Sequence, residues 1–330
     1  MYVSNGGSKC SVISERQTGF LINAYGSTSL EKALISCVDT KCSLTTANEG
    51  YYKNSDSTVD KKLNALIKCN SSGCYKMDSV NGYYLNNAVH YSITDSLIYC
   101  NEDGCNTVNG DGNIYLNKDV TNSFNNALIN CDGKQCSLIN GKEGYYLNSG
   151  GTTFVSDVLI KCENNECTIT AGVPGYFINN AVTNSLKNSL IFCNEGNCNL
   201  ISANENDIYL YAMTNIKLIQ CLSIKCIYYS KSWETESPSI YRNAAVINTY
   251  ENQLIKCVSD GCHTENGNGN TSYYNGNYDS TGKFGDKIHE GILCKNNNCE
   301  LVLKYELGKY KNFIYFIYIL KYFFSIIKFS

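Results

Sequence analysis

Cysteines recur in this chain as pairs separated by four residues, and such pairs can form disulfides, bind a metal ion or remain reactive thiols. Nine C-x4-C pairs account for 18 of the 19 cysteines. Structural zinc sites take four ligands, often including histidine, whereas the three histidines here follow no repeated position. We therefore expect disulfides, with zinc shared between neighbouring pairs and reduced core cysteines as the alternatives. The expected bonds are Cys37–Cys42, Cys69–Cys74, Cys100–Cys105, Cys131–Cys136, Cys162–Cys167, Cys193–Cys198, Cys221–Cys226, Cys257–Cys262 and Cys294–Cys299.

The cysteine pairs belong to a longer repeated unit. The second cysteines follow one another at 31 or 32 residues as far as Cys198, and then at 28, 36 and 37 residues. Most pairs are preceded by "LI", as in "LIKCNSSGC" from Leu66. Eight residues after most second cysteines a second phrase begins, as in "GYYLN" at Gly82–Asn86. Internal repeats of this length are typical of stacked architectures.

Both phrases have the composition of short β-strands. They are apolar, β-branched or aromatic runs bounded by glycine and asparagine, and no helical periodicity precedes the C-terminal tail. The four residues inside each cysteine pair are mostly turn formers that are expected to face water. The sequence therefore predicts an all-β, elongated tandem-repeat array of disulfide-stapled units of about 31 residues, folded as a β-solenoid.

We divide the chain into a repeat region, 1–308, and a tail, 309–330. The repeat region comprises a partial first unit at 1–33, regular units at 34–217 and longer units at 218–308. Asn5 stands where a partner for Cys10 would be, so we expect Cys10 to be unpaired and the sequence to begin inside a longer array. The apolar, basic tail is open to three interpretations: a membrane anchor, an interfacial helix or translated non-coding sequence.

Tyrosine and other aromatic residues occupy two adjacent positions of the second phrase. Neighbouring strand residues face opposite sides. The first position shares its side with a third position that is mostly Leu, Ile or Lys, so these two are expected to face the core. The second position is then expected to form an exposed, partner-binding row; the alternative is that both rows are buried between repeats. This row is Tyr52, Tyr84, Tyr115, Tyr146, Phe177 and Tyr209. The asparagine that ends the phrase is expected to mark a turn.

The sequence carries no recognisable catalytic motif, whether a nucleophile elbow, a zinc-protease helix, a phosphate-binding loop or a dinucleotide fingerprint. One longer segment, 231–242, holds Trp233, Glu234 and Glu236. It is either a sugar-binding or hydrolytic loop or a simple insertion between repeats. We expect no enzyme, no cofactor and no metal. The net charge of -3 provides no basic surface for nucleic acid.

Disulfides indicate an oxidising compartment, so we expect an extracellular or cell-surface protein. Two N-glycosylation sequons, at Asn70 and Asn270, are compatible with this location. The first ten residues have neither the basic region nor the apolar run of a signal peptide, which agrees with an incomplete sequence. Membrane contact is expected only through the tail.

Tandem "LIxC-x4-C" units followed by "GYYLN", in a chain rich in Asn, Lys, Ile and Tyr, resemble the scaffoldins of anaerobic gut fungi. The resemblance extends from about Tyr2 to Gly308 and is looser in the last three units. It implies a non-catalytic scaffold that docks dockerin domains of plant cell-wall-degrading enzymes into a fungal cellulosome. It supplies no residue-level binding motif. The alternative is a cell-surface adhesive or structural repeat protein that binds carbohydrate directly.

Overall fold

The computed structural model describes most of the repeat region as two compact units, Met1–Gly172 and Val173–Ser330. The described residues are 18–26, 28–39, 41–56, 62–151, 155–195, 197–230, 233, 238–269, 271–276 and 291–303, together with the backbone of 2–4 and 10–12. Glu234, Glu236, Asn270 and the tail 309–330 lie outside them.

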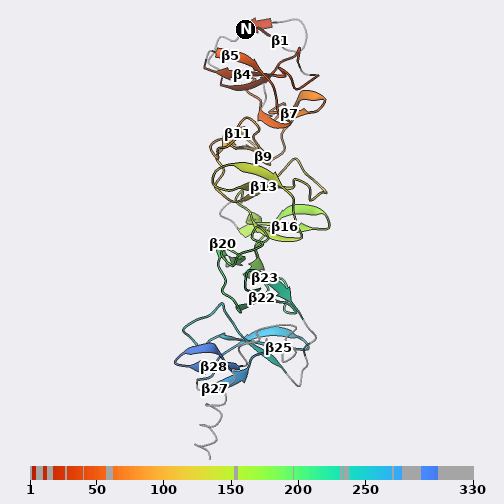
Figure 1. Cartoon of the computed structure of the whole chain (residues 1–330). Helices are drawn as coiled ribbons and strands as arrows, with labels where there is room; N and C mark the ends of the chain where they lie inside the picture. Colours follow the sequence, from red (N-terminus) through yellow and green to blue (C-terminus); the bar gives the residue numbers. More distant parts are fainter. Residues whose placement is uncertain are drawn as a thin grey trace, which may run out of the picture. The chain divides into compact units, whose positions relative to one another are not determined.

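The first unit contains one antiparallel three-stranded sheet per repeat, and Figure 1 labels several of its strands. In every sheet the strands lie in sequence order, with the "LIxC" strand in the centre. We call the three positions the first, central and last strand. The sheets are β3 (Gly19–Ile22), β4 (Leu34–Val38) and β5 (Lys41–Thr45); β6 (Gly50–Lys53), β7 (Leu66–Asn70) and β8 (Gly73–Met77); β9 (Gly82–Leu85), β10 (Leu97–Asn101) and β11 (Gly104–Val108); β12 (Ile114–Leu116), β13 (Leu128–Cys131) and β14 (Cys136–Ile139); and β15 (Gly144–Leu147), β16 (Leu159–Glu163) and β17 (Glu166–Thr170), with the 3-10 turn η1 (Val155–Asp157) before β16.

The second unit repeats the same sheet. Its strands are β18 (Gly175–Ile178), β19 (Leu190–Cys193) and β20 (Cys198–Ile201); β21 (Ile208–Leu210), β22 (Leu218–Leu222) and β23 (Lys225–Tyr229); β24 (Ser239–Arg242), β25 (Leu254–Val258) and β26 (Gly261–Glu265); and β27 (Thr271–Tyr274), β28 (Gly291–Lys295) and β29 (Asn298–Val302). The prediction of an all-β chain of repeated, stapled units of about 31 residues is confirmed.

Two further strands, β1 (Tyr2–Ser4) and β2 (Cys10–Val12), form an antiparallel pair near the start of the chain. Their register places Ser4, rather than the predicted Asn5, opposite Cys10. The pairing of the Cys10 sulfur lies outside what the structure describes.

Each sheet has two faces of different composition. Directly paired residues share a face, and successive residues of a strand alternate between faces. In the sheet of β6, β7 and β8, Tyr51 and Leu66 therefore lie on one face, while Tyr52, Ile67 and Cys69 lie on the other. We call these the Leu face and the Cys face.

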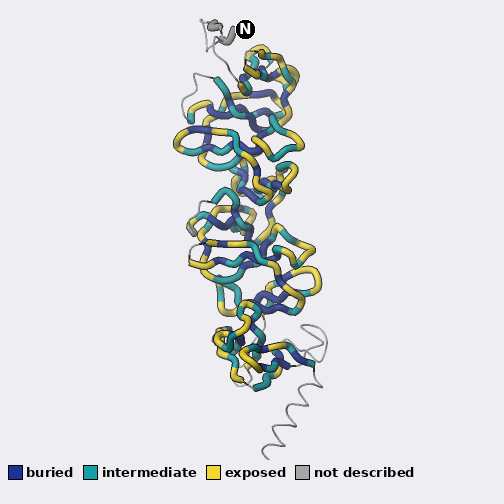
Figure 2. Tube along the Cα trace, turned by 90° about the vertical axis from the view of Figure 1, so that its left-hand side faces the viewer, coloured by how far each residue is buried: buried dark blue, intermediate teal, exposed yellow. Residues whose placement is uncertain are grey.

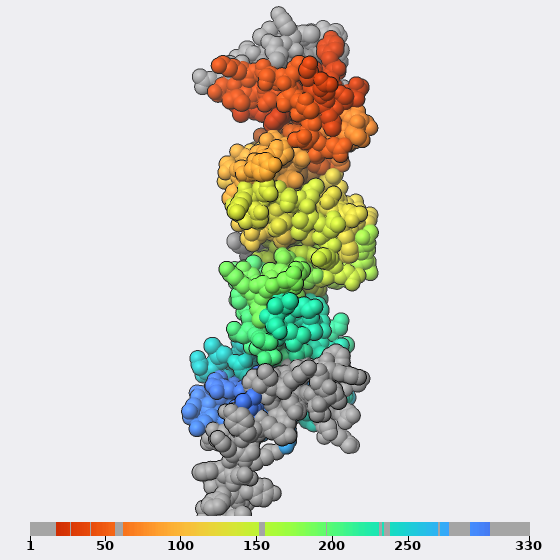
Figure 3. Space-filling model, viewed as in Figure 1, coloured from red at the N-terminus to blue at the C-terminus, as the bar shows by residue number. Residues whose placement is uncertain are grey.

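The Leu face of each sheet packs against the Cys face of the next sheet in the sequence. Tyr51 and Leu66 form one buried cluster with Tyr84, Ile98 and Cys100 of the following repeat. The same arrangement recurs at the other described steps inside each unit. Figure 3 shows the first unit's repeats in sequence order, each against the next.

This packing explains why Leu and Ile both precede eight of the nine first cysteines; Gly291 takes the Leu position before Cys294. Most of these Leu and Ile side chains have no exposed surface, because the two residues face different neighbours. Burial of each is worth about 1.5–3 kcal/mol. A sheet of three short strands cannot hide enough apolar surface alone, so the repeats depend on one another. Figure 2 shows the buried stretches lying along the repeats and exposed loops at their margins.

The same stacking corrects the prediction of an exposed aromatic row. The six side chains expected to face water are 0–5% exposed. They lie on the Cys face, and at the steps inside each unit the preceding sheet covers that face. They are Tyr52, Tyr84, Tyr115, Tyr146, Phe177 and Tyr209. The alternative, that both aromatic positions are buried between repeats, describes the structure. Strand alternation separates core from solvent only where one face of a sheet is open.

A small residue stands five positions after the second cysteine and contacts the next repeat's disulfide. Ala47 clusters with Cys69 and Cys74 in this way. The small residues at this position are Ala47, Ser79, Gly110, Gly141, Gly172, Ala203 and Gly267; Lys231 and Lys304, which depart from the pattern, lie outside the described residues. A Cβ added to Gly110 would lie 2.4 Å from the Sγ of Cys136. The position is therefore limited in size by the disulfide above it.

Backbone contact between consecutive repeats consists mainly of one short parallel bridge per step, with one further bond from the N–H of Cys262 to the carbonyl of Asn215 at 2.7 Å. The residue at the first aromatic position pairs with the asparagine position of the next repeat, as Tyr51 does with Asn86. The N–H of Asn87 then donates to the carbonyl of Tyr51 at 2.8 Å. This bond recurs at the other described steps inside each unit. The apolar faces, rather than a continuous hydrogen-bond ladder, hold the repeats together.

Gly141→Val tests the size limit at the small position. A Cβ there would lie 2.5 Å from Cys167 Sγ and 3.2 Å from Cys162 Sγ. Overpacking of this kind costs about 1–3 kcal/mol, and we expect a corresponding fall in the urea midpoint of the oxidised protein. Lys142→Val, at the exposed neighbouring position, is the control and should leave the midpoint unchanged. Equal midpoints for the two variants would contradict the packing described here.

Candidate functional site: the stapled hairpins

The central and last strands of each repeat form a hairpin that a disulfide closes next to the turn; we call this closed end the base of the exposed tip. The two cysteines are directly opposite in the register of all nine hairpins, as Cys69 is to Cys74. Their Cα atoms are 3.9–4.1 Å apart. Opposite residues share a face, so both sulfurs project onto the Cys face. All nine predicted disulfides are confirmed, and no thiolate of these 18 cysteines is left to bind zinc.

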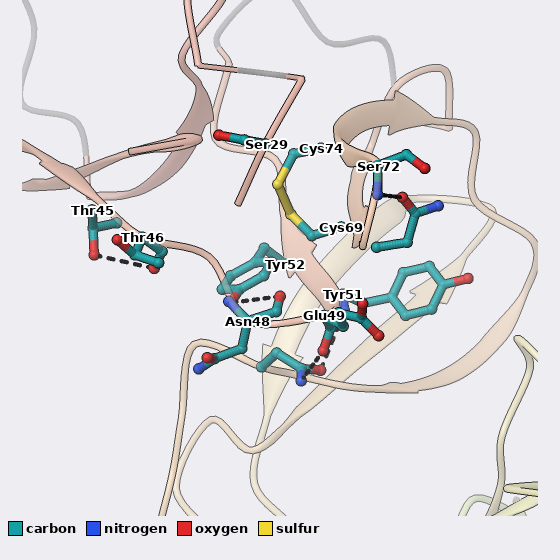
Figure 4. The surroundings of a disulfide bond; sticks show 12 residues. Ser29, Thr45, Thr46, Asn48, Glu49, Tyr51, Tyr52, Cys69, Ser72 and Cys74 are labelled. Atoms are coloured by element: carbon teal, nitrogen blue, oxygen red, sulfur yellow. Dashed lines mark hydrogen bonds between the residues drawn. A yellow bond between two sulfur atoms is a disulfide. The ribbon is translucent and has the colours of Figure 1, made fainter. Parts of the chain in front are cut away.

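The disulfides are parts of the core as well as staples of a turn. Sixteen of these 18 cysteines are buried, and Cys100, Cys131 and Cys294 are among those with no exposed surface. In Figure 4 the Cys69–Cys74 bond lies beside the ring of Tyr52, with which both cysteines share a buried cluster. A stapled hairpin therefore has a buried, fixed base.

The tips of the hairpins are exposed and differ from repeat to repeat. In seven hairpins the strands continue one residue past the cysteines, leaving two-residue turns rather than the four-residue turns expected. Asn164 and Asn165 have φ angles of 51° and 64°, typical of a type I′ turn. Other tips are strongly polar: hydrogen bonds from Lys62 and Asn81 lower the pKa of Glu102, and backbone N–H groups lower that of Asp132.

The tyrosines of the Cys face use their hydroxyls to hold the loop before their own strand. Tyr146 Oη accepts a hydrogen bond from the N–H of Lys142 at 3.0 Å and donates to the Lys142 carbonyl at 3.3 Å. Tyr52 and Tyr84 bind the backbone four residues earlier in the same way. Burial raises the pKa of all three phenols. The ring fills the interface and the hydroxyl satisfies a turn, so tyrosine here has a structural role.

The asparagine that ends the second phrase closes the loop between the first and central strands. Asn117 donates from Nδ2 to the carbonyl of Asn126 at 2.8 Å, and its Oδ1 accepts the N–H of Asp119 at 3.3 Å. Equivalent pairs of bonds are made by Asn23, Asn54, Asn86, Asn148, Asn179 and Asn243. The predicted turn is confirmed. Its long-range bond, to a carbonyl nine or ten residues on, was not visible in the local sequence.

One charged cluster links repeats that are not consecutive. Lys68 Nζ forms an ion pair with Asp119 Oδ1 at 2.7 Å and lies 5.1 Å from the ring centroid of Tyr51. The Tyr51 hydroxyl also donates to Asp119. Burial, followed by the contacts with Asp119, raises the pKa of Tyr51. Asp119 lies in the loop that follows β12, the first strand of the fourth sheet, whereas Tyr51 and Lys68 belong to the second sheet. The cluster therefore joins a loop of one repeat to the sheet two repeats earlier.

Trp233, in the longer segment, is part of the core. The indole is 9% exposed and belongs to a buried cluster with Leu218, Ile255 and Cys257. Other repeats place their small residue against the disulfide in such clusters. A sugar-binding ring needs an open face, which this indole does not present. The residues predicted beside it, Glu234 and Glu236, lie outside the described part of the chain.

Tyr146→Phe separates the two roles of the Cys-face tyrosines. The substitution keeps the ring in place and leaves the Lys142 N–H and carbonyl without their partner. We expect a loss of about 1–2 kcal/mol in the free energy of unfolding. Tyr25→Phe, at a fully exposed ring, is the matched control and should have no effect. Unchanged stability of both variants in urea denaturation would show that the hydroxyl contributes nothing.

Replacing Cys162 and Cys167 by alanine together tests the staple. The bond closes a six-residue ring, and its loss costs roughly 2 kcal/mol by the loop-entropy relation, with a further loss from the buried sulfurs. We expect faster amide exchange in β16 and β17 and a lower urea midpoint. The matched pair Cys37 and Cys42 should cost less, because Cys42 is only half-buried. A midpoint equal to that of the parent protein would refute a stabilising role.

The described residues contain neither a metal-binding cluster nor a helix that could span a membrane. Within the described ranges, no cluster of three or more His, Cys, Asp or Glu side chains is arranged to hold a metal ion. Among the same residues, no helix has the length and apolar character needed to cross a membrane. Comparison of the chain with protein-family models, with curated proteins and with solved structures found no match.

Proposed function

We propose that this chain is a non-catalytic scaffold that docks dockerin-bearing plant cell-wall-degrading enzymes into a fungal cellulosome. The proposal rests on the resemblance of its repeated phrases to scaffoldins and on the repetition of one stapled sheet. The observation that carries it is the contrast between a constant buried base and a variable exposed tip in successive hairpins. Such an array presents hairpins of the same geometry at many positions along the chain.

The exposed residues of the hairpins are the surface on which we place the docking contacts. The last strand is an edge of its sheet. Its second residue after the cysteine lies on the Cys face but is left partly uncovered: Leu138 is 38% exposed and Ile169 is 49% exposed, in consecutive repeats. Exposed apolar side chains on an edge strand can be covered by a partner. This surface replaces the buried aromatic row as the docking candidate.

Multiplicity is what a scaffold gains from such repeats. A partner module held by one repeat is concentrated near the next, so several weak contacts give a large combined avidity. Each unit repeats the same step from sheet to sheet, and we propose that these steps make each unit a β-solenoid. The many disulfides suit an extracellular or cell-surface location, where plant cell walls are degraded.

Calorimetric titration of the oxidised full chain with one purified fungal dockerin tests this function. We expect saturable binding that is lost after reduction and alkylation, because the hairpins then lose their fixed base. The double variant Leu138→Asp and Ile169→Asp should weaken binding. Leu63→Asp, at a 52% exposed loop residue, is the matched control.

Two outcomes would count against docking. Heat changes that do not saturate, with a sample whose nine disulfides have been mapped, would remove the docking role. Sedimentation of the same sample with cellulose in the absence of any dockerin would favour the rival function, direct carbohydrate binding at a cell surface.

A further inference from the structure

Asn70 stands at the tip of the β7–β8 hairpin, between Cys69 and Cys74, and begins the triplet Asn70-Ser71-Ser72. This is an acceptor sequence for N-linked glycans. Ser71 and Ser72 are exposed and Asn70 is half-buried. Figure 4 shows Ser72 outside the buried disulfide and Tyr52. The acceptor therefore lies where the chain turns in solvent.

A hydrogen bond to Oδ1 orients the side-chain amide of Asn70, and the amide nitrogen Nδ2 is available for modification. Its Oδ1 accepts the N–H of Ser72 at 2.9 Å. Among the residues that the structure describes, its Nδ2 has no hydrogen-bond partner. Asn54 is a useful contrast, because its Nδ2 is bonded to the Asn64 carbonyl at 2.7 Å and the residue is 5% exposed. Of these two asparagines, only Asn70 offers an amide nitrogen to a modifying reaction.

We infer that Asn70 carries an N-linked glycan. Its Nδ2 loses one proton and bonds to C1 of the reducing-end sugar of a lipid-pyrophosphate oligosaccharide. The bond from that C1 to the pyrophosphate breaks, and the lipid pyrophosphate leaves. This inference rests on the extracellular location proposed above, since the donor is met on the secretory route. The sugar leaves the buried base of the hairpin unchanged, because Asn70 and Cys69 project from opposite faces of the strand.

The neighbouring hairpin supplies a tip of the same geometry that lacks the acceptor hydroxyl and has Glu102 in place of Ser71. Asn101 occupies the corresponding position, and its Oδ1 accepts the N–H of Asp103 at 2.8 Å. Asn101 is half-buried and Glu102 and Asp103 are exposed, as at the first tip. Asp103→Ser would therefore convert the same geometry into an acceptor sequence.

The test uses the full chain, secreted from yeast behind a heterologous signal peptide, in an Asn270→Gln background that removes the second sequon. The probe is peptide N-glycosidase, followed by mass spectrometry of the tryptic peptide that spans residues 69–76. We expect a downward mobility shift and conversion of Asn70 to Asp. Asn70→Gln and Ser72→Ala should each abolish the shift, and Ser72→Thr should keep it. Asp103→Ser should add a second modified peptide.

An unmodified Asn70 in secreted protein with mapped disulfides would overturn the inference. An unmodified Asn101 in the Asp103→Ser variant would overturn the claim that the shared tip geometry makes the site. Forced secretion separates this result from the proposed function, because the location of the natural protein is not what is measured. Dockerin titration of the Asn70→Gln variant then tests docking independently of the glycan.

Discussion

Everything in this fold depends on the contact between the Leu face of one sheet and the Cys face of the next. Sheets of three strands, with three to five residues in each strand, are too small to be stable alone. Covering both faces removes Leu66 and Ile67 from water completely. Stability then comes from a sum of nearest-neighbour interfaces, as in other repeat proteins. The disulfide lies inside this contact, so its presence affects how closely the two sheets can pack.

The disulfide and the interface between sheets stabilise the fold in different ways. A six-residue ring lowers the conformational entropy of one hairpin before any neighbour is present, by roughly 2 kcal/mol at room temperature. The interface forms only when two such hairpins meet. A size limit at Gly110 and Gly141 follows, because the preformed disulfide of the next repeat is rigid and cannot move aside. Local closure and neighbour packing therefore reinforce each other along the chain.

The sequence was informative wherever the structure is local. Composition predicted the strands, and spacing predicted the nine disulfides, because each cysteine lies five residues from its partner. The turns between the cysteines were expected to have four residues, and in seven hairpins they have two. The row that includes Tyr84 and Tyr146 was placed on the wrong side, since alternation cannot say whether a second sheet covers the other face. The small position was also missed. In most repeats the fifth residue after the second cysteine is Ala, Ser or Gly, and it lies in a segment rich in turn formers. Only a comparison of side-chain size across the repeats could have revealed it.

Polar contacts are made mostly within one repeat, whereas apolar contacts are made between repeats. This difference makes the array easy to lengthen. Most buried polar bonds close within one repeat: Tyr146 binds Lys142, and Asn117 binds Asn126. The links between repeats are mainly apolar, with one backbone bridge per step. Adding or removing a whole repeat therefore adds or removes one apolar interface and leaves few buried polar groups unpaired, and unpaired groups would be costly. Selection on such a chain can change the number of presented hairpins without redesigning any one of them, which is the freedom a docking scaffold needs.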